Sequence, residues 1–144
     1  GARERARGLF ARFGLAGFEG AWPRQLSGGM RQRVALLRTV LVDHPVMLLD
    51  EPFGALDAIT RSDLQGWLSQ LLRAERRTTL LVTHDVDEAL RLSDHVIVCS
   101  PRPARIVAQV MVPAPHPRSP LQITDPDFAM LKRRIVVALT PTGE

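Results

Sequence analysis

The sequence has 144 residues, of which 45% are hydrophobic, 24% charged and 5% aromatic. These proportions are typical of a globular domain or a piece of one, and they exclude disordered and fibrous chains. The single cysteine, Cys99, excludes an intrachain disulfide and a cysteine metal cluster, which favours a reducing compartment. The net charge of +4 would attract anions weakly, and it identifies no partner by itself. The longest apolar runs fall far short of the roughly 20 residues that a membrane helix needs, so we expect no membrane helix.

The first predicted element is a short helix over residues 3–13, which ends in a glycine-rich loop. A second helix is predicted over residues 28–42, because apolar residues recur there at helical spacing. Ser27 is a suitable N-cap for it, and Pro45 closes the segment. The continuous apolar run at residues 46–49 is typical of a strand that is buried on both faces.

Helices and strands continue to alternate after this strand. An amphipathic helix is predicted around residues 64–72, and a buried strand over residues 79–82. Asp85 and Glu88 resemble a capping box that opens a short helix, and residues 96–99 predict a third strand. Because strands and helices alternate, we expect parallel pairing and an α/β fold.

The last part of the chain is predicted to be less regular. Residues 105–112 alternate between apolar and polar, which predicts a fourth strand with one exposed face. Seven of the 11 prolines lie within residues 101–126, which predicts an extended surface segment with little regular structure. Helical spacing within residues 128–139 predicts a final helix that docks by one face.

A first candidate site lies at the start of the second predicted helix, in the run LSGGMRQR at residues 26–33. A helix N-terminus offers unpaired N–H groups and a partial positive charge, and Gly28 and Gly29 leave room for a phosphate. Taken alone, Ser27 with two glycines is more often an ordinary N-cap with a glycine-rich entry loop.

Acidic and imidazole side chains directly follow two of the predicted strands. Asp50 and Glu51 follow one strand and His84 follows the next. In open α/β sheets ligands bind beyond the carboxyl ends of the strands, so one carboxylate is placed to hold Mg²⁺ and the other to accept a proton. His84 is placed to orient a phosphate or a water. Each of these residues also has a purely structural explanation. Asp50 and Glu51 could be a polar strand exit, and His84 could be a cap or a satisfied polar residue. Asp57, six residues beyond Glu51, would by itself be interpreted as a helix N-cap.

In this order and spacing, the motifs resemble those of the ATPase subunit of the ATP-binding cassette family. The sequence LSGGM at residues 26–30 resembles the family's signature motif, and residues 46–51 its Walker B strand with the catalytic glutamate. Residues 54–57 resemble its D-loop, and His84 its switch histidine. Residues 83–90, with residues 102–106, are similar to the importer subgroup for nitrate, sulfonate and taurine.

The resemblance implies an α/β fold with a P-loop NTPase-like parallel sheet flanked by helices, and it implies ATP and Mg²⁺ as ligands. Asp50 would hold Mg²⁺ through water, Glu51 would polarise the attacking water, and His84 would contact the γ-phosphate. These are roles that the family assigns to the matching positions.

The resemblance also implies a second ATPase subunit, arranged head to tail. In the family, ATP lies between the two subunits, so Ser27, Gly28 and Gly29 would bind the γ-phosphate of a nucleotide held by the opposite subunit. Gln32 is assigned to the same nucleotide-binding set. Asp57 would lie at the shared interface.

This sequence departs from the family pattern in two ways. Many relatives have glutamine at the position of Met30, and the methionine here resembles the importer subgroup. No G-x-x-x-x-G-K-[ST] loop is present, since the one lysine, Lys132, is followed by Arg133. We therefore expect the C-terminal half of a subunit, cut inside its helical subdomain and lacking the Walker A half of the sheet.

The expected division is a partial helical subdomain with the signature at residues 1–44, the C-terminal part of a RecA-like nucleotide-hydrolysing core at residues 45–112, and a proline-rich connector with a helix at residues 113–144. Because the other half would supply neighbouring strands, the strands within residues 46–49 and 79–82 are expected to present an open edge or face to water.

The resulting hypothesis is an ATP-hydrolysing subunit that powers an importer for nitrate, sulfonate, taurine or a similar small solute, present as a fragment that is inactive alone. It implies permease subunits, indirectly a periplasmic or extracellular solute-binding protein, and a place at the cytoplasmic face of the membrane. No nucleic-acid partner is expected, because the chain has no tyrosine, and Trp22 and Trp67 are isolated from each other. A soluble non-transport ATPase of the same family and a truncated remnant without autonomous activity remain open alternatives.

Overall fold

The computed structural model describes residues 2–42, 44–74 and 77–140, so the last four residues of the predicted C-terminal segment lie outside it. The chain divides into two compact units. The first is made of Gly1–Leu64 and Glu75–Val82, and the second of Gln65–Ala74 and Thr83–Glu144. None of the helices in the described ranges is long and apolar enough to cross a membrane.

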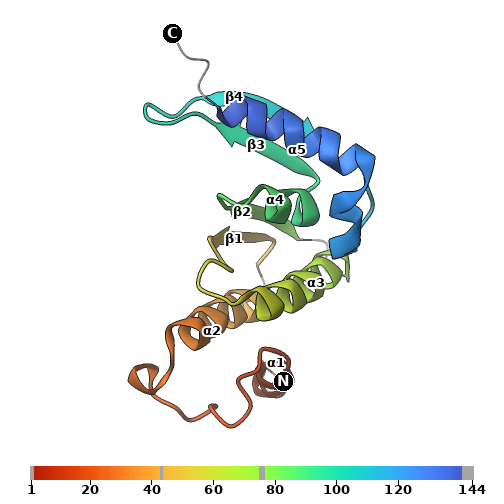
Figure 1. Ribbon diagram of the computed structural model, residues 1–144. Coiled ribbons are helices and arrows are strands. Elements are labelled where there is room, and N and C mark those ends of the chain that lie inside the picture. The colour runs from red at the N-terminus through yellow and green to blue at the C-terminus, as the bar shows by residue number, and fades with distance from the viewer. Residues whose placement is uncertain (1, 43, 75–76, 141–144) are drawn as a thin grey trace. The chain divides into compact units, whose positions relative to one another are not determined.

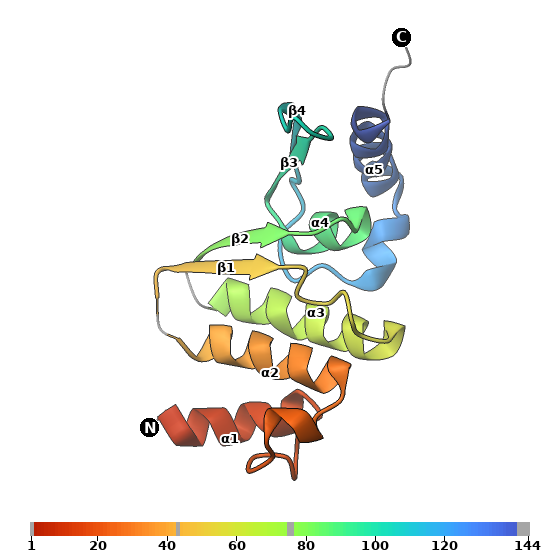
Figure 2. The same ribbon diagram turned by 90° about the vertical axis from the view of Figure 1, so that its left-hand side faces the viewer.

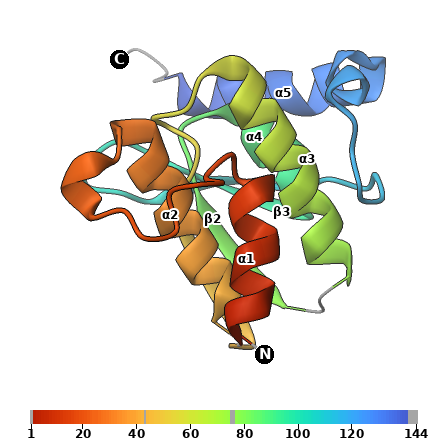
Figure 3. The same ribbon diagram turned by 90° about the horizontal axis from the view of Figure 1, so that it is seen from below.

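The first unit combines two helices, α1 (Ala2–Arg12) and α2 (Gly28–Leu41), with a parallel pair of strands, β1 (Val46–Asp50) and β2 (Thr78–Val82). It also includes the N-terminal part of α3 (Ala58–Ala74), up to Leu64. A 3-10 turn, η1 (Pro23–Gln25), precedes α2. The parallel register, with Val46 opposite Thr78 and Asp50 opposite Val82, confirms the pairing predicted for this part of the chain. In Figure 2 the two strands run side by side, and Figure 3 shows α1 next to α2. The helix α2 also contacts β1.

The strand β1 is covered on only one face. Met47 and Leu49 are buried, whereas Val46 and Leu48 are 53% and 66% exposed. Leu80, which lies opposite Leu48 on β2, is 56% exposed. The prediction that this strand is buried on both faces is therefore wrong for the described residues. The expected open face is confirmed.

A hydrogen-bonded turn ties the end of α1 to α2. Arg33 donates from Nη1 to the carbonyl oxygens of Phe13 and Gly14, at 2.9 and 3.3 Å. Gly14 has a left-handed φ of 62°, and a Cβ there would lie 2.7 Å from Arg33 Nη1. The left-handed backbone conformation therefore favours glycine at position 14, whereas the Arg33 guanidinium, at the end of a flexible side chain, could shift to admit a Cβ.

The second unit contains α4 (Val86–Leu92), β3 (His95–Cys99), β4 (Ile106–Met111), η2 (Pro120–Thr124) and α5 (Pro126–Leu139), together with the C-terminal part of α3 (Ala58–Ala74). Figure 1 shows α5 lying along the two strands. The buried core of the unit consists of Leu90, Val98, Val110, Val112, Phe128 and Ile135.

The strands β3 and β4 pair antiparallel, with Val96 opposite Val110. This corrects the expectation that alternation implies parallel pairing throughout the chain. Only residues 100–105 connect the two strands. A parallel connection needs a crossover of about a dozen or more residues, so this linker permits only a hairpin.

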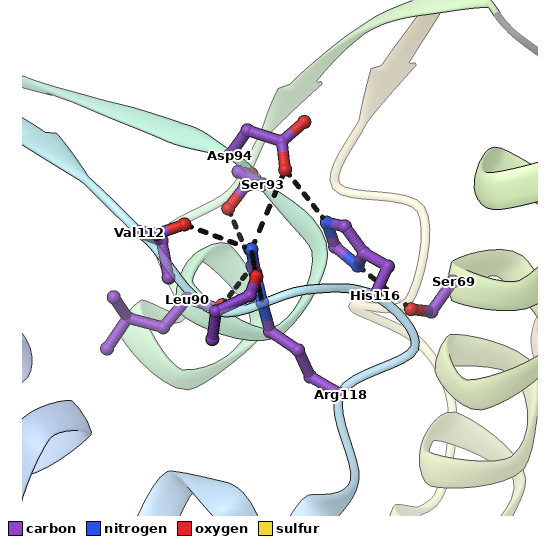
Figure 4. Close-up of polar contacts among 8 residues, drawn as sticks. Ser69, Leu90, Ser93, Asp94, Val112, His116 and Arg118 are labelled. Carbon is purple, nitrogen blue, oxygen red and sulfur yellow. Dashed lines mark hydrogen bonds and ion pairs between the residues drawn. The ribbon is translucent and has the colours of Figure 1, made fainter.

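The sequence predicts that the proline-rich segment lies on the surface. This prediction is wrong in one respect, because the segment carries the buried side chain of Arg118 (Figure 4). The Arg118 guanidinium lies 3.6 Å from Asp94 Oδ1. It also donates to four carbonyl oxygens at 2.6 to 3.2 Å, those of Leu90, Ser93, Val112 and Ala114. Burial lowers the pKa of Arg118, and the Asp94 carboxylate opposes this shift. The five donors of a guanidinium explain why arginine can close this cluster.

The substitution Arg118→Met is expected to destabilise the second unit by about 3 kcal/mol, because several buried carbonyls lose a charged donor. Urea unfolding followed by circular dichroism measures this. The control Arg102→Met changes an exposed arginine and should shift stability by less than about 0.5 kcal/mol. Equal unfolding midpoints for the two variants would contradict the assigned role of Arg118.

The open face of β1 and β2 predicts that the 144-residue chain associates as its concentration rises, because apolar strands exposed to water promote aggregation. The double substitution Leu48→Thr with Leu80→Thr should lower the aggregated fraction in light scattering several-fold. The control Ile59→Thr changes a residue of α3 that is 77% exposed and should have little effect. A monomeric unsubstituted chain with a cooperative, high-temperature melt would count against the prediction.

Candidate functional site

The first turn of α2 is open on one side and packed on the other. Ser27 caps the helix, since its Oγ accepts from the N–H of Met30 at 3.2 Å. A Cβ at Gly28 would meet open space, whereas one at Gly29 would lie 3.4 Å from the carbonyl oxygen of Ala55. The turn therefore leaves Gly28 accessible to an anion, while Gly29 allows close packing on the loop that follows β1.

The predicted acidic pair lies at the carboxyl end of β1. Asp50 is exposed and Glu51 is half-buried. By strand alternation the Asp50 side chain lies on the open face, together with Val46 and Leu48. The carboxylate of Asp50 is therefore on the face that the described residues leave uncovered.

Glu51 has a left-handed backbone, with a φ of 45°, and no other described residue except glycine has a positive φ. Such a conformation typically costs about 1 to 3 kcal/mol and persists where the surroundings over-determine it. Here the N–H of Glu51 donates to the carbonyl oxygen of Val82 at 2.9 Å, which extends the β1–β2 pairing by one residue. The strain therefore falls on the residue predicted to be the catalytic base.

Gln32 lies against Glu51. Its Nε2 donates to the Glu51 carbonyl oxygen at 2.8 Å, and the N–H of Gly54 donates to the same oxygen at 3.3 Å. Sequence reasoning missed this contact. The available signal was that Gln32 lies three residues after Gly29, on the same helix face. The assignment of Gln32 to nucleotide binding stays a prediction.

Asp57 precedes α3 and caps it. Its Oδ1 accepts from the N–H of Thr60 at 3.0 Å. Hydrogen bonds from the backbone and the side chain of Thr60 lower the pKa of Asp57, which keeps the carboxylate ionised. This is the N-cap that the position predicts by itself, and the interface role of Asp57 stays a prediction.

His84 belongs to the second unit and is exposed, two residues beyond the end of β2. It precedes α4, whose N-cap Asp85 accepts from the N–H groups of Asp87 and Glu88 at 2.9 and 3.1 Å. The predicted helix start is confirmed. The convergence of the His84 imidazole with the acids of the first unit stays a prediction.

Among the residues that the structure describes, no three acidic, histidine or cysteine side chains form a group that could hold a metal ion. Mg²⁺ does not need such a group, because it usually keeps several waters and binds one or two carboxylates together with substrate phosphates. The exposed carboxylate of Asp50 at a strand end fits this kind of site.

A second polar cluster in the second unit has the residue types of a hydrolytic triad (Figure 4). Ser69 Oγ lies 3.1 Å from His116 Nδ1, and His116 Nε2 lies 3.2 Å from Asp94 Oδ1. Ser69 is 0% exposed, so no substrate reaches its hydroxyl. The cluster is therefore structural.

This cluster predicts a loss of stability in mild acid. Burial lowers the pKa of His116, the nearby Arg118 charge lowers it further, and Asp94 opposes both. The unfolded imidazole, with a pKa of 6.5, therefore takes up a proton more readily than the folded one. Stability contributed by neutral His116 is fully present above pH 6.5 and declines as pH falls below it.

The variant His116→Gln keeps polar atoms toward Ser69 and Asp94 but does not titrate. The urea concentration at the unfolding midpoint should therefore fall less in this variant than in the unsubstituted chain when the pH is lowered from about 7.5 to 5.5. The control His44→Gln, at an exposed position, should leave that fall in place. The same pH dependence in both variants would show that His116 is not its source.

The comparisons with known proteins agree on one family. Residues 1–54 match the family model described as ABC transporter. The aliphatic sulfonates import ATP-binding protein SsuB 1 of Rhodococcus jostii (strain RHA1) is 53% identical over 116 residues, which cover 81% of this chain and 46% of the relative. The formylaminopyrimidine import ATP-binding protein ThiZ of Halalkalibacterium halodurans is 45% identical over 120 residues, covering 83% and 48%.

A solved structure is similar in fold as well. The dimeric structure of a post-hydrolysis state of the ATP-binding cassette MJ0796, bound to ADP and Pi, matches with a TM-score of 0.67 and 29% identity. The match covers 78% of this chain and 47% of that one. This chain thus spans about half the length of the relatives it matches. The predicted α/β fold, covering part of such a cassette, is confirmed.

Proposed function

The chain belongs to the ATP-binding cassette (ABC) transporter family, and on this premise we propose that it is the signature and Walker B part of an ATP-hydrolysing subunit of an importer. The observation that carries the proposal is the junction of α2 with the end of β1. There a serine-capped, glycine-rich helix start packs on the loop that carries Glu51. This is an arrangement suited to binding phosphate and activating water at one rim of a sheet.

Glu51 acts as the general base in this proposal. Its carboxylate accepts a proton from the water that attacks the γ-phosphate, and such a base typically contributes about 10²- to 10⁴-fold in rate. Asp50 would hold Mg²⁺, and the ion would neutralise charge on the phosphates. The exposure of Asp50 and the constrained backbone of Glu51 support this division of roles.

Ser27, Gly28 and Gly29 bind the γ-phosphate of a nucleotide held by a second ATPase subunit in a head-to-tail dimer. The accessible Gly28 and the capped helix start support this role. His84 contacts the γ-phosphate at its own subunit's site, and Asp57 lies at the shared interface. These assignments rest on the match of each position to the family motif.

The remaining proposals concern the larger assembly. The subunit binds transmembrane permease subunits at the cytoplasmic face of the membrane and acts indirectly with a solute-binding protein. Nitrate, a sulfonate, taurine or a similar small solute is transported, a choice supported by the sulfonate importer relative. We retain the division into residues 1–44, 45–112 and 113–144 as the functional division. The chain alone is inactive, because its sequence contains no loop of the G-x-x-x-x-G-K-[ST] type.

The test supplies the missing phosphate loop. The chain is mixed with the N-terminal part of the Rhodococcus jostii relative, and Mg²⁺-dependent ATP turnover is measured. The mixture should hydrolyse ATP, whereas neither part should do so alone. The variant Glu51→Gln should lower kcat by about 10²- to 10⁴-fold, because it removes the base, while ATP binding stays within about twofold.

Asp127→Asn is the matched control, since it makes the equivalent acid-to-amide change at an exposed position in the first turn of α5. Its kcat should equal that of the unsubstituted mixture. Normal turnover by the Glu51→Gln mixture would remove Glu51 from its assigned role. A mixture that never hydrolyses ATP would favour a remnant without activity.

A further inference from the structure

We propose that Gln32 is a positioning residue for Glu51, whose side-chain amide holds the Glu51 backbone in the conformation from which the carboxylate acts. The inference rests on the proposed function in one respect, because that function assigns Glu51 as the base. The hydrogen bond itself is independent of that assignment. It joins the helix of the signature motif to the catalytic loop of the same chain.

The first argument is the set of contacts around the Glu51 peptide groups. The N–H of Glu51 is held by Val82 of β2 at 2.9 Å. Its carbonyl oxygen accepts from Gly54 N–H at 3.3 Å and from Gln32 Nε2 at 2.8 Å. Gly54 is part of the same turn, whereas Gln32 lies 19 residues away on α2. Gln32 is therefore a side-chain donor that ties the carbonyl side of this turn to a separate, rigid helix.

The second argument is the strained backbone itself. A φ of 45° is unfavourable for a residue with a side chain, and it persists only when neighbouring contacts select it. A donor that holds the carbonyl oxygen restricts the rotation of the peptide group next to the Cα of Glu51. The direction of the carboxylate depends on that Cα. Loss of the Gln32 amide should therefore let Glu51 relax toward ordinary backbone conformations.

The third argument is that α2 meets the loop at a second point. A Cβ on Gly29 would lie 3.4 Å from the carbonyl oxygen of Ala55 and 3.7 Å from Leu56 Cδ2. Gln32 follows Gly29 by three residues and lies on the same face of the helix. One face of α2 thus contacts both the start and the end of the loop. A shift of the helix would act on Glu51 through Gln32.

This link connects two sites under the proposed function. The first turn of α2 binds the nucleotide of the opposite subunit, and Glu51 acts on water at its own subunit's nucleotide. Gln32 lies in the next turn of the same helix and donates to the backbone carbonyl oxygen of Glu51. The position of Glu51 is therefore linked to the helix that binds the nucleotide of the opposite subunit.

The experiment uses the ATP-hydrolysing mixture described above. Gln32→Leu removes the donor at similar side-chain volume and should lower kcat by about 10- to 100-fold, because small misplacements of a catalytic group are costly. Binding of a non-hydrolysable ATP analogue should stay within about twofold. The control Gln122→Leu makes the same change in η2, where the amide oxygen caps Ser119 N–H, and should leave kcat unchanged. A kcat for Gln32→Leu within about twofold of the unsubstituted mixture would overturn the proposal.

A double substitution separates positioning from a general effect on folding. If Gln32 acts through Glu51, then Gln32→Leu should cause no further loss of kcat in the Glu51→Gln background. An equal loss in both backgrounds would show that Gln32 acts elsewhere, and the proposal would be wrong.

Hydrogen exchange tests the link without ATP. The measured quantity is the exchange rate of the Glu51 amide, which is bonded to Val82, in the 144-residue chain. This rate should rise about tenfold in Gln32→Leu and should not change in Gln122→Leu. Unchanged exchange in Gln32→Leu would overturn the proposal. A mixture that fails to hydrolyse ATP would instead count against the proposed function, while exchange still decides whether Gln32 holds Glu51.

Discussion

The parallel pairing of β1 with β2 is the constraint on which the candidate site depends. It brings the carboxyl ends of the two strands to one edge, with Asp50 opposite Val82. The hydrogen bond from Glu51 N–H to Val82 continues the pairing past the last residue of β1. Glu51 is thereby held as an extension of the sheet before the chain turns away. If this register slipped by one residue, the side chains of Asp50 and Leu49 would exchange faces.

The helix α2 adds the second restraint and gives the site its two sides. Its first turn leaves Gly28 accessible, while Gly29 and Gln32 contact the loop after β1. A single element thus presents the turn proposed to bind an anion and also contacts the residue proposed as the base. The uncovered face of β1, which carries Asp50, remains accessible in the described residues.

The second unit shows how similar residue types take different roles according to burial. His84 is exposed just beyond a strand, whereas His116 lies between Ser69 and Asp94 with its ring mostly buried. Arg118 lies in the same cluster, and its guanidinium replaces water for several carbonyl oxygens. The proline-rich segment is therefore an integral part of this unit, because removing it would leave buried polar groups without a donor.

The sequence by itself determined the features that depend on neighbouring residues. Ser27 and Asp85 cap their helices as predicted, because capping joins a side chain to N–H groups two or three residues away. The helices, the paired strands β1 and β2, and the family motifs were likewise readable, since periodicity and motif spacing are local patterns. Sequence reasoning missed the antiparallel pairing of β3 with β4. Parallel pairing was inferred from the alternation of strands and helices, without use of the short connection between these two strands.

Only the tertiary structure decided the contacts between distant segments. The Gln32 bond to Glu51 spans 19 residues, and the Arg118 bond to Leu90 spans 28. Sequence reasoning found neither contact, because a glutamine on a helix or an arginine among prolines is ordinarily solvated. Their burial and partners follow from how the segments pack, and Glu51, with its left-handed backbone, likewise has hydrogen-bond partners on both α2 and β2.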